Sequence, residues 1–420
     1  MEFISLGIFA GCYVLFIFLP KLRMPIAVSG AVLLLFTRVV SLSEALSSIN
    51  WNVMGIFVGT LVVADVFMKS RVPAYLAEII VTKAKNTIWA ILLICVLTGF
   101  ISAFVENVAT VLIVAPVALT LAKKIRLNPV KMMIAIAVSS NLQGAATLIG
   151  DPPSMLLGGF ARMNFGDFFF YKGKPSIFFA VELGALTSFV VLYFVFKQHR
   201  KKEAVKLAER VKSWVPSYLL AAMIFALALS SFFDPGFSYT AGVICMIFGV
   251  VCALWEIFVN KGKLIQGLKS LDWDTTFFLM GIFVLVGAIT LTGWIEKISV
   301  FFSGLVGQNI FLGFTLLVYV AVVLSAFVDN VPFLAAMIPV AISMSQELGI
   351  EPSLFLFGLL IGASLGGNIT PIGASANIVA CGLLKKEGYT VRFRDFITIG
   401  LPFTLAAVVP AYLFIWLVWK

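Results

Sequence analysis

Charge is scarce in this sequence of 420 residues: Asp, Glu, Lys and Arg make up 12% of it, whereas 61% is hydrophobic. Soluble globular domains are about one quarter charged, so the composition excludes a soluble fold. Apolar runs of about 17–25 residues, long enough to cross a bilayer, recur along the chain. They lack the alternating pattern of a membrane β-barrel. We therefore expect an all-α integral membrane protein.

Signatures of catalysis and metal binding are missing as well. Histidine occurs once, as His199 in the basic segment KQHRKKE, and the 5 cysteines lie singly in apolar segments. The sequence contains no Walker motif, metal motif or nucleophile elbow. An enzyme is therefore not expected. The net charge of +10 comes from basic residues in short loops between spans, which is typical of membrane proteins and does not indicate nucleic-acid binding.

Two pairs of motifs repeat at one fixed separation. SAFVENVATVLIVAPVA at 102–118 returns as SAFVDNVPFLAAMIPVA at 325–341, and NLQGAATLIGDPPSM at 141–155 returns as SLGGNITPIGASANI at 364–378. The separation is 223 positions in both cases (329 minus 106, and 370 minus 147). Two motifs at one separation indicate an internal duplication.

The charge of equivalent loops predicts how the repeats are oriented. KKIRLNPVK at 123–131 is strongly basic, whereas QELGIEPSL at 346–354 has two glutamates and no base. Because basic loops favour the cytoplasmic side, these two loops should face opposite sides of the membrane. We predict two inverted transmembrane repeats, 1–198 and 214–420, joined by a cytoplasmic basic linker at 199–213.

Each repeat should contain about five spans, one of them broken, and a re-entrant hairpin. The hairpins are expected at 88–122 and 309–345, and the broken spans near 130–160 and 353–384. The other spans are expected at 5–20, 25–40, 52–69, 175–197, 214–232, 239–259, 273–293 and 396–419. The basic loops expected on the cytoplasmic side lie around 69–85, 123–131, 197–212, 261–269 and 385–394, which leaves both termini outside.

An acid at each hairpin tip is the costly feature of the sequence. A carboxylate near the bilayer centre costs about 2.5–3.5 kcal/mol, and Glu106 and Asp329 both lie within apolar runs. One such acid could simply cap a broken helix, but two at equivalent positions of inverted repeats favour a functional role. We predict that each holds a cation, with sodium as a candidate. No lysine or arginine in the central motifs balances them. By contrast, Asp65 should pair with Lys69 one turn later.

The chain breaks beside the tips complete the predicted site. GDPPS and DNVP are helix-start signatures, and helix N-termini attract anions. Side-chain oxygens are hard ligands for sodium or acceptors for a proton. The predicted cation-binding residues are Glu106, Asn107, Gly144, Thr147, Asp151, Asp329, Asn330, Gly367, Asn368 and Thr370. The predicted substrate-binding residues are Asn107, Gly150, Pro152, Ser154, Asn330, Gly373, Ser375 and Asn377.

At these motifs the sequence resembles the ArsB/NhaD-type permeases of the ion transporter superfamily. SAFVDNVPF, GASLGGNITPIGASANIV and ATLIGDPPS are similar to signatures of the P protein-like members, and more distantly to citrate and dicarboxylate–sodium symporters. The resemblance implies cation coupling, an elevator motion, a homodimer and location in the cell (inner) membrane. The tips Glu106-Asn107-Val108 and Asp329-Asn330-Val331 depart from the Ser-Asn-Thr of the dicarboxylate symporters. Ser154 likewise replaces an Asn that Asn377 retains.

The sequence therefore predicts a secondary active transporter that moves a small inorganic or organic anion. Its coupling ion would be sodium or a proton, and no other cofactor is expected. Two other transporter types stay open: a sodium–proton antiporter, and an arsenite efflux permease with or without a separate ATPase. An ion channel is the alternative from a different class, although discontinuous helices favour alternating access. The expected partners are the anion, the lipid bilayer and a second copy of the chain.

Overall fold

The computed structural model describes residues 1–124, 127–198, 210–234, 236–259, 267, 269, 271–307 and 309–420. Within these residues the regular structure is helical apart from one small antiparallel hairpin, β1 (Phe170–Tyr171) and β2 (Lys174–Pro175). The helical fold class is therefore confirmed. The expected linker at 199–213 and the expected loop at 261–269 lie largely outside the described residues.

The first half is a succession of helices with short connections. These are α1 (Glu2–Phe18), η1 (Pro20–Leu22), α2 (Arg23–Phe36), α3 (Leu42–Ser48), α4 (Trp51–Lys69), α5 (Val72–Lys83), α6 (Thr87–Ser102), α7 (Asn107–Lys124), α8 (Val130–Gly144), α9 (Pro152–Ala161), η2 (Gly166–Phe168) and α10 (Ile177–Phe196).

The second half is built in the same way. Its helices are α11 (Val215–Ser230), α12 (Thr240–Phe258), α14 (Trp273–Leu291), α15 (Trp294–Val306), α16 (Ile310–Ser325), α17 (Asn330–Glu347), α18 (Ser353–Gly366), η3 (Gly367–Ile369), α19 (Ser375–Lys386) and α20 (Phe393–Trp419).

Several helix ends recur at the separation seen in the sequence. α6 and α16 begin and end at equivalent residues, and so do α7 and α17. Local capping repeats too: the Asn86 side chain accepts a hydrogen bond from Trp89 N, and Asn309 does the same for Leu312 N. A cap of this kind satisfies one of the free N–H groups of a helix start. The helix order thus agrees with a duplicated unit, while its inversion across a membrane stays a prediction.

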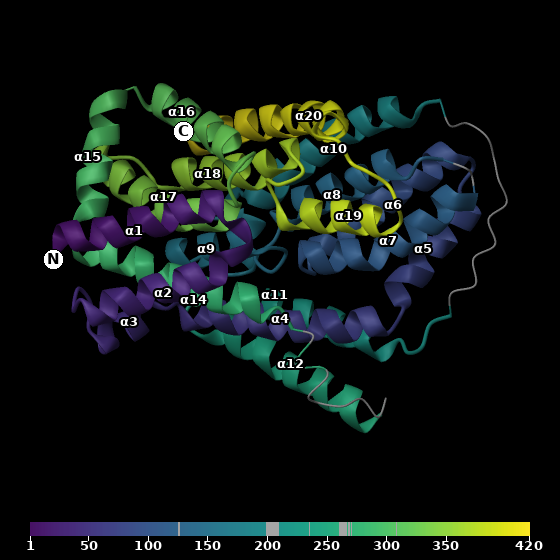
Figure 1. The fold of residues 1–420 in the computed structure, drawn as a ribbon, viewed down its shortest axis with the longest axis horizontal. Coiled ribbons are helices and arrows are strands. Elements are labelled where there is room, and N and C mark those ends of the chain that lie inside the picture. Colours follow the sequence, from purple (N-terminus) through teal and green to yellow (C-terminus); the bar gives the residue numbers. More distant parts are fainter. Residues whose placement is uncertain are drawn as a thin grey trace.

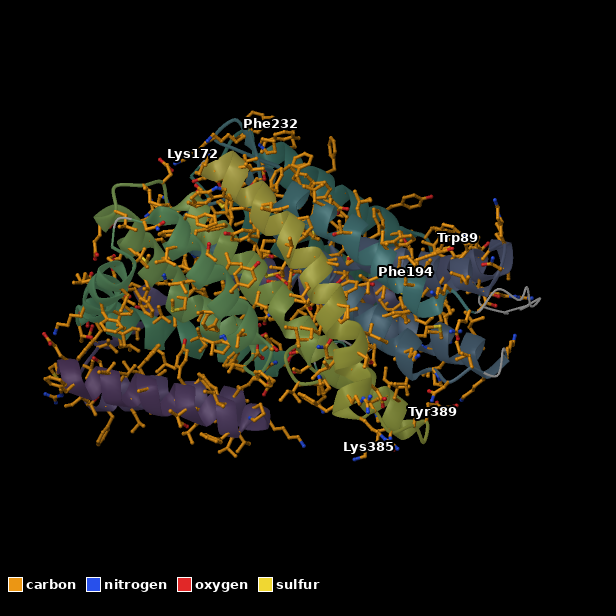
Figure 2. The ribbon with its side chains drawn as sticks, turned by 90° about the horizontal axis from the view of Figure 1, so that it is seen from above. Trp89, Lys172, Phe194, Phe232, Lys385 and Tyr389 are labelled. Atoms are coloured by element: carbon orange, nitrogen blue, oxygen red, sulfur yellow. The ribbon has the colours of Figure 1, made fainter. Side chains whose placement is uncertain are left out.

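The helices are apolar enough for a multi-pass membrane protein. In the described part of the chain, six are long and apolar enough to cross a bilayer, namely α4, α7, α10, α12, α14 and α20, and the α15–α16 pair, bent by 117°, would make a seventh. The outer surface of the molecule is rich in apolar side chains, as Figure 2 shows for Trp89 of α6, Phe194 of α10 and Phe232 after α11, which are 39%, 59% and 82% exposed. Such surfaces suit lipid rather than water.

Residues 69–85, expected to be a basic loop, mostly form helix α5. Val72, Ala77 and Val81 of this helix are buried, so its apolar face packs into the protein. Arg71 takes a left-handed conformation (φ 62°) that separates α5 from α4. A turn of this kind usually contains glycine. Because no glycine stands here, the sequence did not indicate the boundary between the two helices. The expected pair of Lys69 with Asp65 is present at 2.6 Å.

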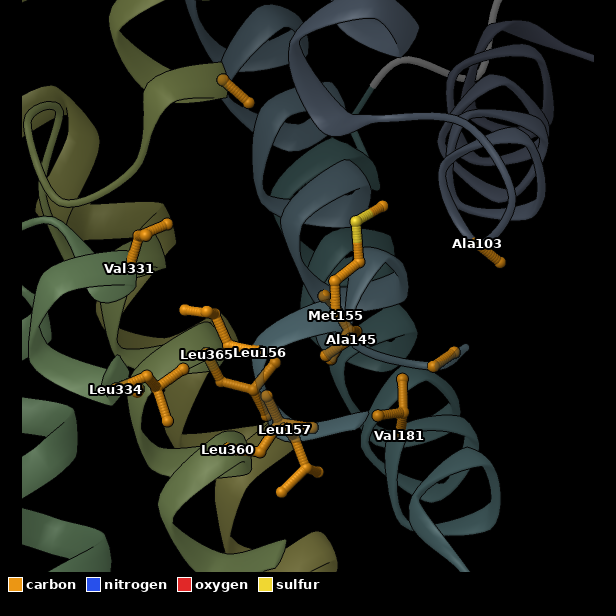
Figure 3. Close-up of a cluster of buried hydrophobic side chains, with 14 of the residues drawn as sticks. Ala103, Ala145, Met155, Leu156, Leu157, Val181, Val331, Leu334, Leu360 and Leu365 are labelled. Atoms are coloured by element: carbon orange, nitrogen blue, oxygen red, sulfur yellow. The ribbon is translucent and has the colours of Figure 1, made fainter. Parts of the chain in front are cut away.

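The two hairpins lie at opposite ends of the molecule. Figure 1 shows α5, α6 and α7 gathered at one end and α15, α16 and α17 at the other, with both termini at the latter end. The broken spans cross between the halves, because α9 packs against α17 and α19 packs against α7. Figure 3 shows the resulting contact, in which Leu156 and Leu157 of α9 lie beside Leu360 and Leu365 of α18. The two halves are therefore interlocked through their broken spans.

Candidate functional site

Each tip acid begins the second helix of its hairpin. Glu106 Oε2 accepts a hydrogen bond from Ala109 N at 3.0 Å, at the start of α7. Asp329 Oδ1 accepts one from Val331 N at 3.0 Å, at the start of α17. Capping therefore uses one oxygen of each carboxylate, and the second oxygen of each remains for another partner.

Equivalent threonines tie each broken span to its hairpin. The Thr147 hydroxyl donates to Ala103 O, and the Thr370 hydroxyl donates to Ala326 O. Both threonines are fully buried. Each hydroxyl proton is thus used inside the fold, and only an oxygen lone pair is left for a cation. These residues hold the tips in place.

Four predicted glycines lie where the helices are interrupted, and each is in close contact with neighbouring atoms. A Cβ on Gly373 would lie 2.6 Å from Gly367 O, and one on Gly367 would lie 2.7 Å from Gly373 O. In the first half, a Cβ on Gly150 would overlap Gly144 O, and one on Gly144 would overlap the Asn107 side chain. The expectation that Gly150 and Gly373 have little room for a side chain is confirmed.

The first half of the site holds a carboxylate oxygen without a partner. Asp151 Oδ1 caps α9 by accepting a hydrogen bond from Ser154 N at 2.9 Å, as the GDPPS motif predicted. Asp151 is 1% exposed, and its Oδ2 has no hydrogen-bond partner within the described part of the chain. The side chains of Asn107 and Ser154 lie close enough to interact with the Asp151 carboxylate, although neither reaches Oδ2 at hydrogen-bond distance, and Asn107 Oδ1 accepts a hydrogen bond from Ser102 Oγ at 2.6 Å. Glu106 is near enough for its charge to interact with that of Asp151.

The second half of the site contains a base that the sequence analysis missed. Arg23 Nη1 lies 2.5 Å from Asp329 Oδ2 and 3.4 Å from Ser375 Oγ. The central motifs themselves contain no base, as expected, but Arg23 from outside them balances Asp329, which the sequence did not predict. Arg23 lies in the segment KLRMP between the first two spans, far from both motifs in sequence. Its basic character within a short loop was the only available signal.

Asparagines join the two halves at the centre. Asn141 Nδ2 donates to Asn368 Oδ1 at 2.9 Å and to Asn377 Oδ1 at 2.8 Å. Asn377 Nδ2 donates to Gly367 O and Thr370 O, both at 2.9 Å. The polar side-chain atoms of Asn377, a predicted substrate ligand, are thus all engaged within the fold. Asn368 Nδ2 is buried and has no partner among the described residues, so it is free to donate.

The remaining predicted residues lie at helix starts. Pro152 begins α9, Asn330 begins α17 and Ser375 begins α19. Arg23 brings the starts of α17 and α19 together. Asp272, which caps α14 and was not predicted, interacts electrostatically with both Glu106 and Arg23. The structure therefore gathers most of the predicted residues around one centre. Among the described residues, no cluster of three or more His, Cys, Asp and Glu could hold a metal ion.

Comparison with solved structures identifies related folds. The YdaH transporter of Alcanivorax borkumensis matches with a TM-score of 0.64 and 14% identity over 91% of this chain and 87% of that chain. MtrF of Neisseria gonorrhoeae, from a class described as antimetabolite efflux pumps, matches with a TM-score of 0.59 and 13% identity over 91% and 83%. At these identities the likeness concerns the fold alone.

Sequence relatives cover the whole chain. An uncharacterized transporter of Synechocystis sp. is 29% identical over 98% of this chain and 97% of its own length. An uncharacterized transporter of Mycobacterium tuberculosis is 27% identical over 99% and 98%. The human P protein is 26% identical over 95% of this chain, which spans 58% of that protein. These relatives support the resemblance to P protein-like permeases.

The sequence pattern of one family matches almost the full length. The pattern described as CitMHS, citrate transporter, matches residues 13–362 and 262–420. Together with relatives named as transporters, this match excludes an enzyme and makes the chain a multi-pass membrane transporter. The protein belongs to the citrate transporter family CitMHS.

Proposed function

We propose that the chain is a secondary active transporter of the cell (inner) membrane that couples a small anion to sodium or protons. The observation that carries this proposal is the pair Glu106 and Asp151. Both carboxylates lie at helix starts inside a membrane protein, and Asp151 Oδ2 is buried without a partner among the described residues. A buried charge without an opposite charge beside it is costly, so a cation or a proton bound there would stabilise the site.

The helix starts supply the anion-binding part of the proposal. The N-termini of α7, α9, α17 and α19 carry free N–H groups and partial positive charge. The proposed anion-binding residues around them are Asn107, Gly150, Pro152, Ser154, Asn330, Gly373 and Ser375, with Asn377 as a support. A bound cation would reduce the repulsion between the acids and an incoming anion, so cation binding should strengthen anion binding, and the reverse must also hold.

The family description makes a tricarboxylate such as citrate the first anion to test. The hairpin tips differ from those of dicarboxylate symporters, so the panel should also include dicarboxylates, phosphate and arsenite. Broken helices at the centre favour alternating access over a continuous channel pore. A homodimer is part of the proposal through the resemblance alone.

A sodium–proton antiporter is the second candidate, and the same two first-half acids favour it. Purified protein in liposomes, with sodium and proton gradients imposed singly, separates the two functions. Anion uptake driven by one gradient supports the proposed symport. Exchange of sodium for protons with no anion present would identify an antiporter, and passive flux that no gradient drives uphill would indicate a channel.

A further inference from the structure

Arg23 is fixed to α14 by its contacts with the first turns of that helix. Its Nη2 donates to Thr275 Oγ1 at 2.9 Å, and its Nε lies 3.4 Å from Asp274 Oδ2. The guanidinium also lies over the Phe278 ring, 5.2 Å from the centroid. α2, which begins at Arg23, packs along α14. The position of the positive charge is therefore set by helices outside the hairpins.

Held in this position by α14, the Arg23 guanidinium contacts Asp329, the tip acid of the second half. Nη1 contacts Asp329 Oδ2, while Asp329 Oδ1 is already used by Val331 N. Both oxygens of Asp329 are thus occupied. The side chains of Arg23 and Asp329 are 18% and 24% exposed, so the pair is largely withdrawn from solvent. A close partner of opposite charge offsets much of the cost of placing this acid inside the protein.

The first half has the opposite composition. Glu106 and Asp151 contribute two carboxyl groups, and neither forms an ion pair with any described residue. The residue equivalent to Asp151 in the second half is Ala374. At the hairpin tip and the start of the broken span, the first half therefore has two acids and no base, while the second half has one acid, Asp329, paired with Arg23. Arg23 also interacts with Asp272 and Asp274 at the start of α14. Of these carboxylates, Asp151 has a buried oxygen without a hydrogen-bond partner among the described residues, so a bound cation would stabilise the first half more than the second.

We propose that Arg23 is the permanent cation of the second half, and that the exchangeable cation binds only in the first half, beside Glu106 and Asp151. The inference rests on the cation coupling proposed above and reduces two equivalent cation sites to one. Carboxylate oxygens are ligands for hard cations and acceptors for protons, so the exchangeable cation is the sodium ion or proton of the coupling proposed above. Arg23 then acts as a positioning residue that holds the start of α17 while the first half binds its cation.

Thermal unfolding of the purified full-length protein in detergent tests the inference. One series replaces choline chloride with sodium chloride at pH 8, and a second lowers the pH without sodium. A ligand that binds only the folded state raises Tm. We expect one of the two series to raise Tm in the wild type. Glu106→Gln should shift the midpoint of that response by about tenfold or more, whereas Asp329→Asn should leave it within about twofold.

Two further variants separate the ion pair from the cation site. Arg23→Gln exposes Asp329 and should add a second cation-binding step, seen as increased radioactive sodium binding per chain or as a second pH-dependent rise in Tm. The double variant Arg23→Gln/Asp329→Asn removes both charges and should keep the wild-type response. The stability changes of the two single variants should be non-additive, as expected for residues in contact. If Arg23→Gln does not fold, the double variant carries this test.

The outcomes distinguish the inference from the proposed function. Equal loss of the response in Glu106→Gln and Asp329→Asn would overturn the single-site inference and leave cation coupling intact. Additive stability changes for Arg23 and Asp329 would overturn the ion pair and with it the inference. A wild type that responds to neither sodium nor pH would overturn both the inference and the proposed coupling.

Discussion

The two halves of the site share a backbone and differ in charge. Thr147 and Thr370 make the same hydrogen bond, and Gly150 and Gly373 meet the same carbonyls of their own half. Around this common frame, the first half has Asp151 where the second has Ala374, and only the second receives Arg23. A duplicated fold can thus keep its geometry while the two copies take different electrostatic roles. The shared backbone geometry and the different charges can therefore be tested separately.

The largest effect is expected from placing side chains at the buried glycines of the shared backbone. Gly150→Leu and Gly373→Leu should each abolish transport, because a side chain there would overlap the Gly144 or Gly367 carbonyl and move the broken span. Uptake into liposomes measures the loss, and membrane yield shows that folded protein remains. Gly382→Leu is the matched control, since no atom lies within 4 Å of its Cβ position. Full transport by both central variants would refute the shared frame.

A second test compares Asn141 with Ser364, its equivalent in the second half. Asn141→Ala should destabilise the protein by about 1–3 kcal/mol, because two buried acceptors lose their donor. Ser364→Ala should change stability by less than about 0.5 kcal/mol, because the buried Ser364 hydroxyl has no hydrogen-bond partner within the described residues. Chemical unfolding in detergent measures both. Similar losses for the two variants would mean that the central asparagines do not join the halves.

The threonine pair should behave symmetrically. Thr147→Val and Thr370→Val each remove one buried hydrogen bond to a hairpin carbonyl. In membrane proteins such bonds contribute about 0.6 kcal/mol on average and about 1.7 kcal/mol at most. We therefore expect a small, equal fall in Tm for both variants. A fall confined to one half would show that the frame is itself asymmetric.

The smallest effect on stability, and the direct test of inversion, comes from surface cysteines. Lys124 and Gln346 are exposed residues at the ends of the equivalent helices α7 and α17. Cysteine at either exposed position should change stability by less than about 0.5 kcal/mol. A membrane-impermeant thiol reagent should label Lys124→Cys from the cytoplasm and Gln346→Cys from outside. Labelling of both from one side would disprove the inverted topology.

Much of the fold could be predicted from local signals in the sequence. The hairpins and the broken spans were located by their repeated motifs, and Asp151 was identified as a helix cap from the two prolines that follow it. Helix α5 was missed because Arg71 makes a left-handed turn that no glycine announces. The equivalent helix α15 was missed as well, although Gly293 (φ 74°) precedes it. Both missed helices are shorter than a membrane span, so the search for spans passed over them.

The charge balance of the site could not be predicted, for a different reason. Arg23 and Asp329 are 306 residues apart, and Asn141 bonds partners 227 and 236 residues away. No periodicity or motif links such positions, because their contact depends on how whole helices pack. The repeat could suggest which residues are equivalent, but it could not show that only one tip acid has an arginine.

The interlocking of the broken spans bears on how the protein is made. α9 of the first half packs on α17, and α19 of the second half packs on α7. When the first half leaves the ribosome, the Asn141 amide has no acceptor, because Asn368 and Asn377 do not yet exist. At about 5–20 residues per second, roughly 10–45 seconds of synthesis separate them. During that interval the polar centre of the first half lacks the residues that will cover it. Partner helices, lipid or insertion factors therefore have to shield it until the second half is synthesised.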